Sequence, residues 1–160
     1  MLLSDILKEL DTRIITGDPS CDVTSVEFDS RRVQAGSVFV CIKGFTVDGH
    51  SFAGSAASSG AACVIVDKDR EGFDDDTLIE AVKDTGCVVV ETKDTKKALA
   101  VMAAALQGHP ERELDVYGIT GTKGKTTSAF LLRAIFEAAG KKSGLVGTVC
   151  NLIGDEKIPA

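Results

Sequence analysis

The sequence contains no long apolar run and no basic leader segment. None of its apolar stretches approaches the roughly 18 residues that a helix needs to cross a bilayer. The first ten residues include Asp5 and Glu9, whereas a secretory signal begins with basic residues and continues as an apolar stretch. These absences predict a cytoplasmic protein that does not insert into a membrane.

Residue spacings typical of metal-binding cysteines or of covalent catalysis are also missing. The five cysteines are far apart and form no Cys-x-x-Cys pair: Cys21, Cys41, Cys63, Cys87 and Cys150. Disulfides and a cysteine-based metal site are therefore not expected. The chain has only two histidines, and no Ser-His-Asp or Cys-His arrangement supports a nucleophilic mechanism.

Basic residues are too few for a nucleic-acid-binding surface. The chain has 18 Lys and Arg against 24 Asp and Glu, a net charge of -6, which repels a phosphate backbone and excludes nucleic acid as an expected partner. An anionic ligand would have to be held by backbone dipoles and one or two lysines. The composition is 44% hydrophobic and 26% charged, which is typical of a globular protein.

Helical and strand patterns alternate along the chain and predict an α/β fold with a mostly parallel sheet. Helices are expected over 2–10, 52–60, 77–83 and 95–106, and strands over 23–28, 37–42, 62–66 and 87–91. The segment 107–110 contains a Gly and a Pro, which end helices. We therefore expect one domain over 1–108 and a second over 109–160.

The second domain is expected to contain one βαβ unit, with strands over 114–120 and 143–150 and a helix over 125–139. A unit of about 50 residues has a sheet face and a helix face that need neighbours to cover them. The prediction is therefore that this segment is the start of a truncated ATP-binding domain in a longer protein.

A glycine-rich loop with the sequence GITGTKGKTT lies at residues 118–127, between the expected strand and helix. In such a loop, backbone N–H groups and the helix N-terminus bind phosphate, a lysine reaches the terminal phosphates and a hydroxyl binds Mg²⁺. Lys125 is the candidate catalytic residue and Thr126 the candidate Mg²⁺ ligand. The candidate nucleotide-binding residues are Gly121, Thr122, Lys123, Gly124, Lys125, Thr126 and Thr127.

The loop is a variant of the common pattern G-x-x-x-x-G-K-[ST], because Ile119 occupies the place of the first glycine. One alternative is a glycine-rich turn that binds nothing. Lys123 either touches a phosphate or is simply an exposed lysine.

The loop resembles the ATP loop of the Mur ligases and of the related folylpolyglutamate synthases. The motif Asp-Ser-Arg at 29–31, followed by Lys-Gly-Phe-Thr-Val-Asp-Gly-His at 43–50, is similar to the N-terminal domain of the Mur ligases. Thr122 and the later Gly-Thr-Val at 147–149 resemble the members that add the third amino acid to UDP-N-acetylmuramoyl-L-alanyl-D-glutamate.

This resemblance implies an ATP- and Mg²⁺-dependent amide ligase of peptidoglycan precursor synthesis, monomeric, acting through an acyl phosphate. Its substrates would be the UDP-muramoyl dipeptide and an amino acid, either diaminopimelate or lysine. The residues that the resemblance places against the uridine are Phe28, Ser30, Phe45, Thr46 and Val47. Some relatives have His and Gln at the positions of Phe45 and Thr46, so backbone contacts would carry part of the binding there.

Two other functions stay open at this point. The chain could be a non-catalytic module that binds the UDP-sugar peptide, or it could belong to a folylpolyglutamate-type ligase. Several side chains also have more than one interpretation. Asp29 and Arg31 bind substrate or form a surface ion pair, or Asp29 caps a turn. His50 is a ligand or a base, or it supports the start of a helix. His109 is expected to lie in the linker.

Overall fold

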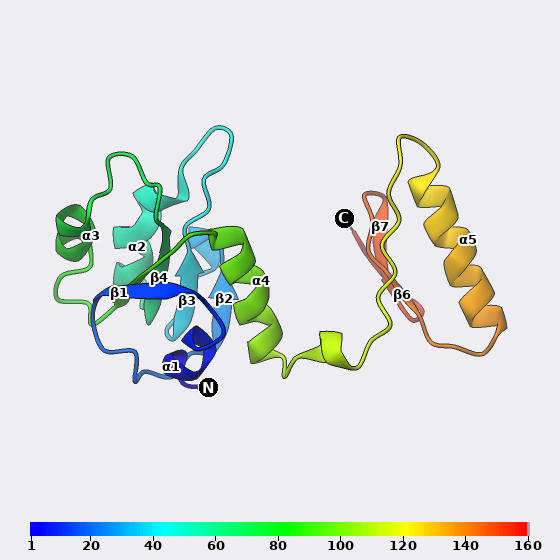
Figure 1. Cartoon of the computed structure of the whole chain (residues 1–160), viewed down its shortest axis with the longest axis horizontal. Helices are drawn as coiled ribbons and strands as arrows, with labels where there is room; N and C mark the ends of the chain where they lie inside the picture. Colours follow the sequence, from blue (N-terminus) through cyan, green and yellow to red (C-terminus); the bar gives the residue numbers. More distant parts are fainter. Residues whose placement is uncertain (160) are drawn as a thin grey trace. The chain divides into compact units, whose positions relative to one another are not determined.

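The computed structural model describes residues 1–159 of the chain (Figure 1). It divides into two compact units, Met1–Leu114 and a second that begins at Asp115. Each unit is described by itself below. Within residues 1–159, none of the helices combines the length and the apolar character that crossing a membrane would require.

The first unit is built on a five-stranded sheet with strand order β1-β5-β4-β3-β2. The strands are β1 Thr12–Thr16, β2 Ser25–Glu27, β3 Ser37–Val40, β4 Cys63–Asp67 and β5 Val88–Thr92. Strands β2 to β5 are parallel and β1 is antiparallel to β5. The predicted α/β fold with a mostly parallel sheet is confirmed, and the sequence prediction lacked β1, a half-exposed edge strand that contains Arg13.

Helices precede, connect and follow the strands of this unit, and aspartates cap the N-termini of two of its α-helices. The α-helices are α1 Leu3–Leu7, α2 Ala53–Ser58, α3 Asp75–Ala81 and α4 Thr95–Leu106, and the 3₁₀ helices are η1 Ser30–Arg32, η2 Gly49–Phe52 and η3 Pro110–Arg112. Asp74 accepts a hydrogen bond from the Thr77 amide and Asp94 from the Lys97 amide, so each side chain satisfies a free N–H of the first turn. Helix α4 has its predicted bounds, whereas α1 ends at Leu7, before the predicted Leu10.

The core of this unit consists of two apolar layers, one on each face of the sheet. Helices α1 and α4 cover one face and contact the side chains of Val38, Val40, Cys63, Ile65, Val88 and Val90. Helices α2 and α3 cover the other and contact Phe39, Cys41, Val64, Val66 and Val89. Burial on both faces explains why these strands are continuous apolar runs.

The second unit contains α5 (Lys125–Ala138) and a three-stranded antiparallel sheet of β6 (Gly144–Leu145), β7 (Cys150–Ile153) and β8 (Glu156–Pro159). The helix was predicted correctly within a residue, but the predicted βαβ unit is wrong. Residues 115–120 form no regular secondary structure and pair with no strand among residues 1–159. A strand needs a hydrogen-bonded neighbour. The Tyr117 ring of this segment lies 5.4 Å from that of Phe136 between centroids.

The predicted strand over 143–150 is also wrong in its bounds. Strand β6 ends at Leu145, and the chain turns before β7 begins at Cys150. The Gly147 amide donates to the side-chain oxygen of Asn151 over 3.2 Å, so this turn is closed by a side chain that the apolar pattern does not show.

Candidate functional site

The glycine-rich loop leads into the N-terminus of α5. Gly124 stands at the N-cap position with φ of 82°, in the left-handed region that glycine adopts without the steric strain caused by a Cβ. The first amide with a backbone partner in the helix is that of Ser128, which donates to the Gly124 carbonyl over 2.9 Å. A helix leaves the N–H groups before this one without intrahelical partners, so those of Lys125, Thr126 and Thr127 are available to an anion.

Lys125 closes the loop on itself. Its Nζ donates a hydrogen bond to the carbonyl oxygen of Gly121 over 2.6 Å, and this bond is exposed to solvent. The ammonium group is thereby held beside the loop backbone, and a phosphate oxygen entering the loop can exchange with the carbonyl as its partner.

The loop residues fit a nucleotide phosphate and a magnesium ion. No atom lies within 4 Å of the Cβ position at Gly118 or Gly124, so the space beside the backbone is open. All of residues 118–127 are exposed. The phosphate-loop residues predicted from the sequence lie together on the loop and on the first turn of the helix that follows it. Within residues 1–159, the His, Cys, Asp and Glu side chains form no cluster of three or more that could hold a metal. The Thr126 hydroxyl offers an oxygen ligand of the kind that Mg²⁺ prefers.

In the first unit, two loops leave the same edge of the sheet. Residues 28–32 follow the carboxyl end of β2, and residues 41–48 follow the carboxyl end of the adjacent β3. Ligands of open α/β sheets bind outside the carboxyl ends of the strands. The structure therefore brings the two segments that the sequence singled out, 28–30 and 45–47, to one edge.

Apolar side chains on these loops are exposed to an unusual degree. Phe28 is 62% exposed, Val47 is 54% exposed and Phe45 is fully exposed. Aromatic side chains are expected to be buried, and exposed ones beside polar backbone are suited to stack on a planar ligand such as a nucleobase.

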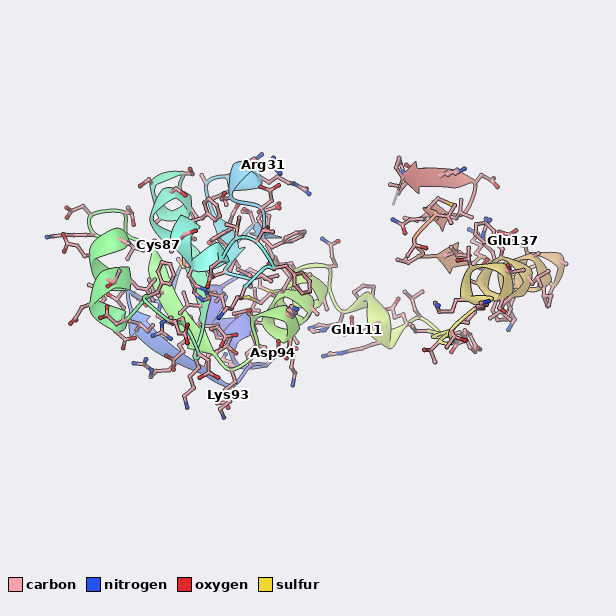
Figure 2. All side chains as sticks on the ribbon, turned by 90° about the horizontal axis from the view of Figure 1, so that it is seen from above. Arg31, Cys87, Lys93, Asp94, Glu111 and Glu137 are labelled. Carbon is pink, nitrogen blue, oxygen red and sulfur yellow. The ribbon has the colours of Figure 1, made fainter. Side chains whose placement is uncertain are left out.

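Asp29 organises the loop after β2. Its carboxylate accepts hydrogen bonds from the Arg31 amide over 3.1 Å and from the Arg31 guanidinium, with Nη2 to Oδ2 at 2.6 Å. These bonds, above all those of the guanidinium, lower the pKa of Asp29 to about 2. Figure 2 shows Arg31 at the outer surface of the first unit. The interpretation of Asp29 and Arg31 as a surface ion pair is therefore confirmed, and Ser30 lies between them at the start of η1.

The loop after β3 is a closed turn. The Gly44 amide donates to the Val47 carbonyl and the Gly49 amide donates to the Ile42 carbonyl, both over 3.0 Å. A Cβ on Gly49 would lie 2.6 Å from the nitrogen of Ile42, so only glycine fits there. The turn presents residues 45–47 at its tip.

His50 is buried behind this turn, with 2% of its surface exposed. Its Nδ1 lies 2.6 Å from Oδ1 of Asp48, and its Nε2 accepts a hydrogen bond from the Asp67 amide over 2.9 Å. Both ring nitrogens therefore have protein partners, which confirms the structural role at the start of a helix. His109 lies between α4 and η3, in the segment expected to be the linker. Its Nε2 lies 3.0 Å from Oε1 of Glu9 and its Nδ1 lies 2.9 Å from Oε1 of Glu111.

The fold and the loops are those of an α/β protein in which a glycine-rich loop precedes a helix. This arrangement is found in nucleotide-binding proteins. The sequence profile described as Mur ligase family, catalytic domain, matches residues 22–107. The chain belongs to the Mur ligase family.

Curated relatives match most or all of the chain. The UDP-N-acetylmuramoyl-L-alanyl-D-glutamate--2,6-diaminopimelate ligase of Clostridium perfringens is 43% identical over 160 residues, covering 100% of this chain and 31% of the relative. The protein of the same name from Bacillus velezensis is 43% identical over 138 residues, covering 86% of this chain and 26% of the relative. The chain thus spans between 26% and 31% of the length of these two relatives.

A solved structure has the same fold. MurF from Acinetobacter baumannii superposes with a TM-score of 0.60 at 21% identity, covering 85% of this chain and 27% of that one. At this identity the likeness establishes the architecture only.

Proposed function

We propose that a protein containing this chain is an ATP-dependent ligase that adds diaminopimelate to UDP-N-acetylmuramoyl-L-alanyl-D-glutamate. The observation that carries the proposal is the 43% identity, over all 160 residues, to a relative with that name. The geometry of the two loop regions supports it, because each offers groups suited to one of the two nucleotides.

The loop at 118–127 is proposed as the ATP site. Bound ATP would supply the phosphoryl group that activates the D-glutamyl carboxylate as an acyl phosphate, which the amine of the amino acid then attacks, releasing phosphate. The amides of Lys125, Thr126 and Thr127 would bind phosphate oxygens, and the Lys125 ammonium would stabilise charge on the transferring group. Gly121, Thr122, Lys123 and Gly124 would surround the phosphates with backbone.

Magnesium is proposed to lie beside Thr126. A hydroxyl in the first turn of α5 supplies one oxygen ligand, and the remaining ligands would be phosphate oxygens and water, as Mg²⁺ prefers. Thr126→Val keeps the shape of the side chain and removes the hydroxyl, so it should weaken the Mg²⁺ dependence of ATP binding.

The sheet edge of the first unit is proposed as the uridine site. Phe28 and Phe45 would cover the faces of the base, while the Ser30 hydroxyl and the backbone of Thr46 and Val47 would bond its polar edge. Binding at this remote end would position the carboxylate for reaction. We further propose a cytoplasmic, monomeric enzyme.

The activity is tested with a protein that carries this chain together with the rest of the relatives' length. We expect ADP release to depend on both the UDP-muramoyl dipeptide and diaminopimelate, and a Lys125→Met variant serves as the control for contaminating ATPases. Release with lysine in place of diaminopimelate would overturn the choice of amino acid. Release only with folate would favour the folylpolyglutamate alternative, and dipeptide binding without any release would favour the binding module.

A further inference from the structure

His50 connects the turn after β3 to the neighbouring strand β4. Its partners are Asp48, on the turn itself, and the amide of Asp67, the last residue of β4. The ring is almost fully enclosed and lies 5.7 Å from the ring of Phe73 between centroids. The turn and the end of β4 are thereby joined at the edge proposed to bind uridine.

The hydrogen bonds determine which ring nitrogen carries the proton. An amide N–H can only donate, so Nε2 must accept from Asp67 and has no proton. Nδ1 therefore carries the proton and donates it to the Asp48 carboxylate over 2.6 Å. The neutral ring acts as a bridge with one donor and one acceptor, and no other protonation state satisfies both contacts.

Asp48 is the point at which the turn is fixed. Its carboxylate accepts from the His50 amide over 3.0 Å as well as from the ring, and its carbonyl accepts from the Ser51 hydroxyl over 2.7 Å. The segment just before Asp48 is 45–47, which is exposed and has no comparable side-chain anchor of its own.

We propose that His50 is a positioning residue for the uridine site: it holds the turn at 45–47 in its binding conformation by tying it to the end of β4. The inference rests on the proposed function, since it concerns the same sheet edge. Substitution of a residue whose only role is to fill the core changes stability. Substitution of a positioning residue also changes ligand affinity, by more than the change in stability explains.

Two substitutions of His50 distinguish its bond to the Asp67 amide from its bond to the Asp48 carboxylate. His50→Gln offers an acceptor at about the reach of Nε2 and retains the bond to the Asp67 amide, whereas His50→Asn offers a donor at about the reach of Nδ1 and leaves that amide without a partner. We expect His50→Asn to lower the affinity of the 160-residue chain for UDP by about tenfold, because a buried donor is left unsatisfied and the turn is released. His50→Gln should stay within about threefold of the unsubstituted chain.

Leu78→Ala is the matched control. Leu78 is 1% exposed and belongs to the apolar layer of α2 and α3, so its truncation lowers stability without touching the turn. We expect unchanged UDP affinity in this variant. A ligand-free measurement accompanies the titration: hydrogen exchange at the amides of Gly44, Gly49 and Asp67 should accelerate in His50→Asn and not in Leu78→Ala.

The outcomes are distinct. Equal UDP affinity in His50→Asn and the unsubstituted chain would overturn this inference and leave the proposed function intact. An equal loss of affinity in Leu78→Ala and His50→Asn would also overturn it, since stability alone would then explain the loss. Failure of the unsubstituted chain to bind UDP would overturn the uridine site and this inference together, even if exchange at the three amides behaved as expected.

Discussion

The Nζ of Lys125 donates a hydrogen bond to the carbonyl oxygen of Gly121 over 2.6 Å. This contact places the ammonium group at the loop before any phosphate arrives. Because carboxylate and phosphate oxygens are stronger acceptors than a carbonyl, a bound nucleotide should take over the lysine. The two lysines of the loop differ in this contact: among residues 1–159, the Lys125 ammonium has a backbone acceptor and the Lys123 ammonium has none.

Substitution of the two lysines should therefore have different effects. We expect Lys125→Met to reduce ligation by on the order of 100-fold through loss of charge stabilisation on the phosphoryl group. Lys123→Met, the matched control, should change it by less than about fivefold, as expected for an exposed side chain. Steady-state ADP release by the longer protein measures both, and equal losses would refute the separate role of Lys125.

Gly124 should be sensitive to alanine for a purely conformational reason. Its φ is 82° and no atom outside the neighbouring residues lies within 4 Å of the Cβ position, so Ala meets no clash but must adopt the left-handed region at a cost of ~1–2 kcal/mol. We expect Gly124→Ala to weaken ADP binding about tenfold by depopulating the loop conformation. Gly118→Ala is the control, since Gly118 has equally open surroundings without a positive φ. Calorimetry should find its affinity unchanged, and a comparable loss there would argue against the backbone explanation.

Glu91 should contribute to acid sensitivity of the first unit. It accepts hydrogen bonds from Arg13 over 2.7 Å and from Arg70 over 2.7 Å, and the pKa of Glu91 falls from 4.5 to about 2, chiefly through the bond from Arg13. A lowered pKa contributes stability that is fully present above about pH 4.5 and is lost as the pH falls toward 2.

Comparison of Glu91→Gln with the unsubstituted chain isolates this contribution. We expect the variant to be less stable at pH 7 and the difference in free energy of unfolding to shrink as the pH falls from about 4.5 to 2. Glu80→Gln removes an exposed partner of Lys83 and should have little effect at any pH. Urea unfolding at several pH values provides the test, and a difference that does not change with pH would show that ionisation of Glu91 is not involved.

Gly49 should tolerate no side chain. An added Cβ would lie 2.6 Å from the nitrogen and 2.8 Å from the carbonyl oxygen of Ile42, so the turn would have to shift at a cost of ~1–3 kcal/mol. We predict that Gly49→Ala lowers both the thermal stability of the first unit and its affinity for UDP. Thermal unfolding with and without UDP measures the two effects, and a variant with unchanged stability would contradict the close approach of Gly49 to Ile42.

The sequence was sufficient where a local pattern and a local signal agree. Helix α4 was predicted with its bounds, because its apolar spacing ends at the Gly-His-Pro sequence that follows it. The parallel strands were predicted because burial on both faces produces apolar runs. The glycine-rich loop was located because its chemistry depends on consecutive residues.

The sequence was insufficient where structure depends on a distant partner. Residues 114–120 have a strand-like composition, yet a strand forms only beside another strand, and sequence periodicity does not reveal that neighbour. The bridge from Asp48 through His50 to Asp67 joins residues that are 17 apart at its β4 end. A His two residues after an Asp signals a local contact at most, so the link to β4 could not be predicted.

We propose above that the sheet edge of the first unit holds the uridine end of the UDP-muramoyl dipeptide. The most direct measurement is a titration of the 160-residue chain with UDP and then with that dipeptide, following backbone amide shifts. We predict saturable shifts at Ser30 and residues 45–47. An absence of shifts at these positions under saturating ligand would contradict it.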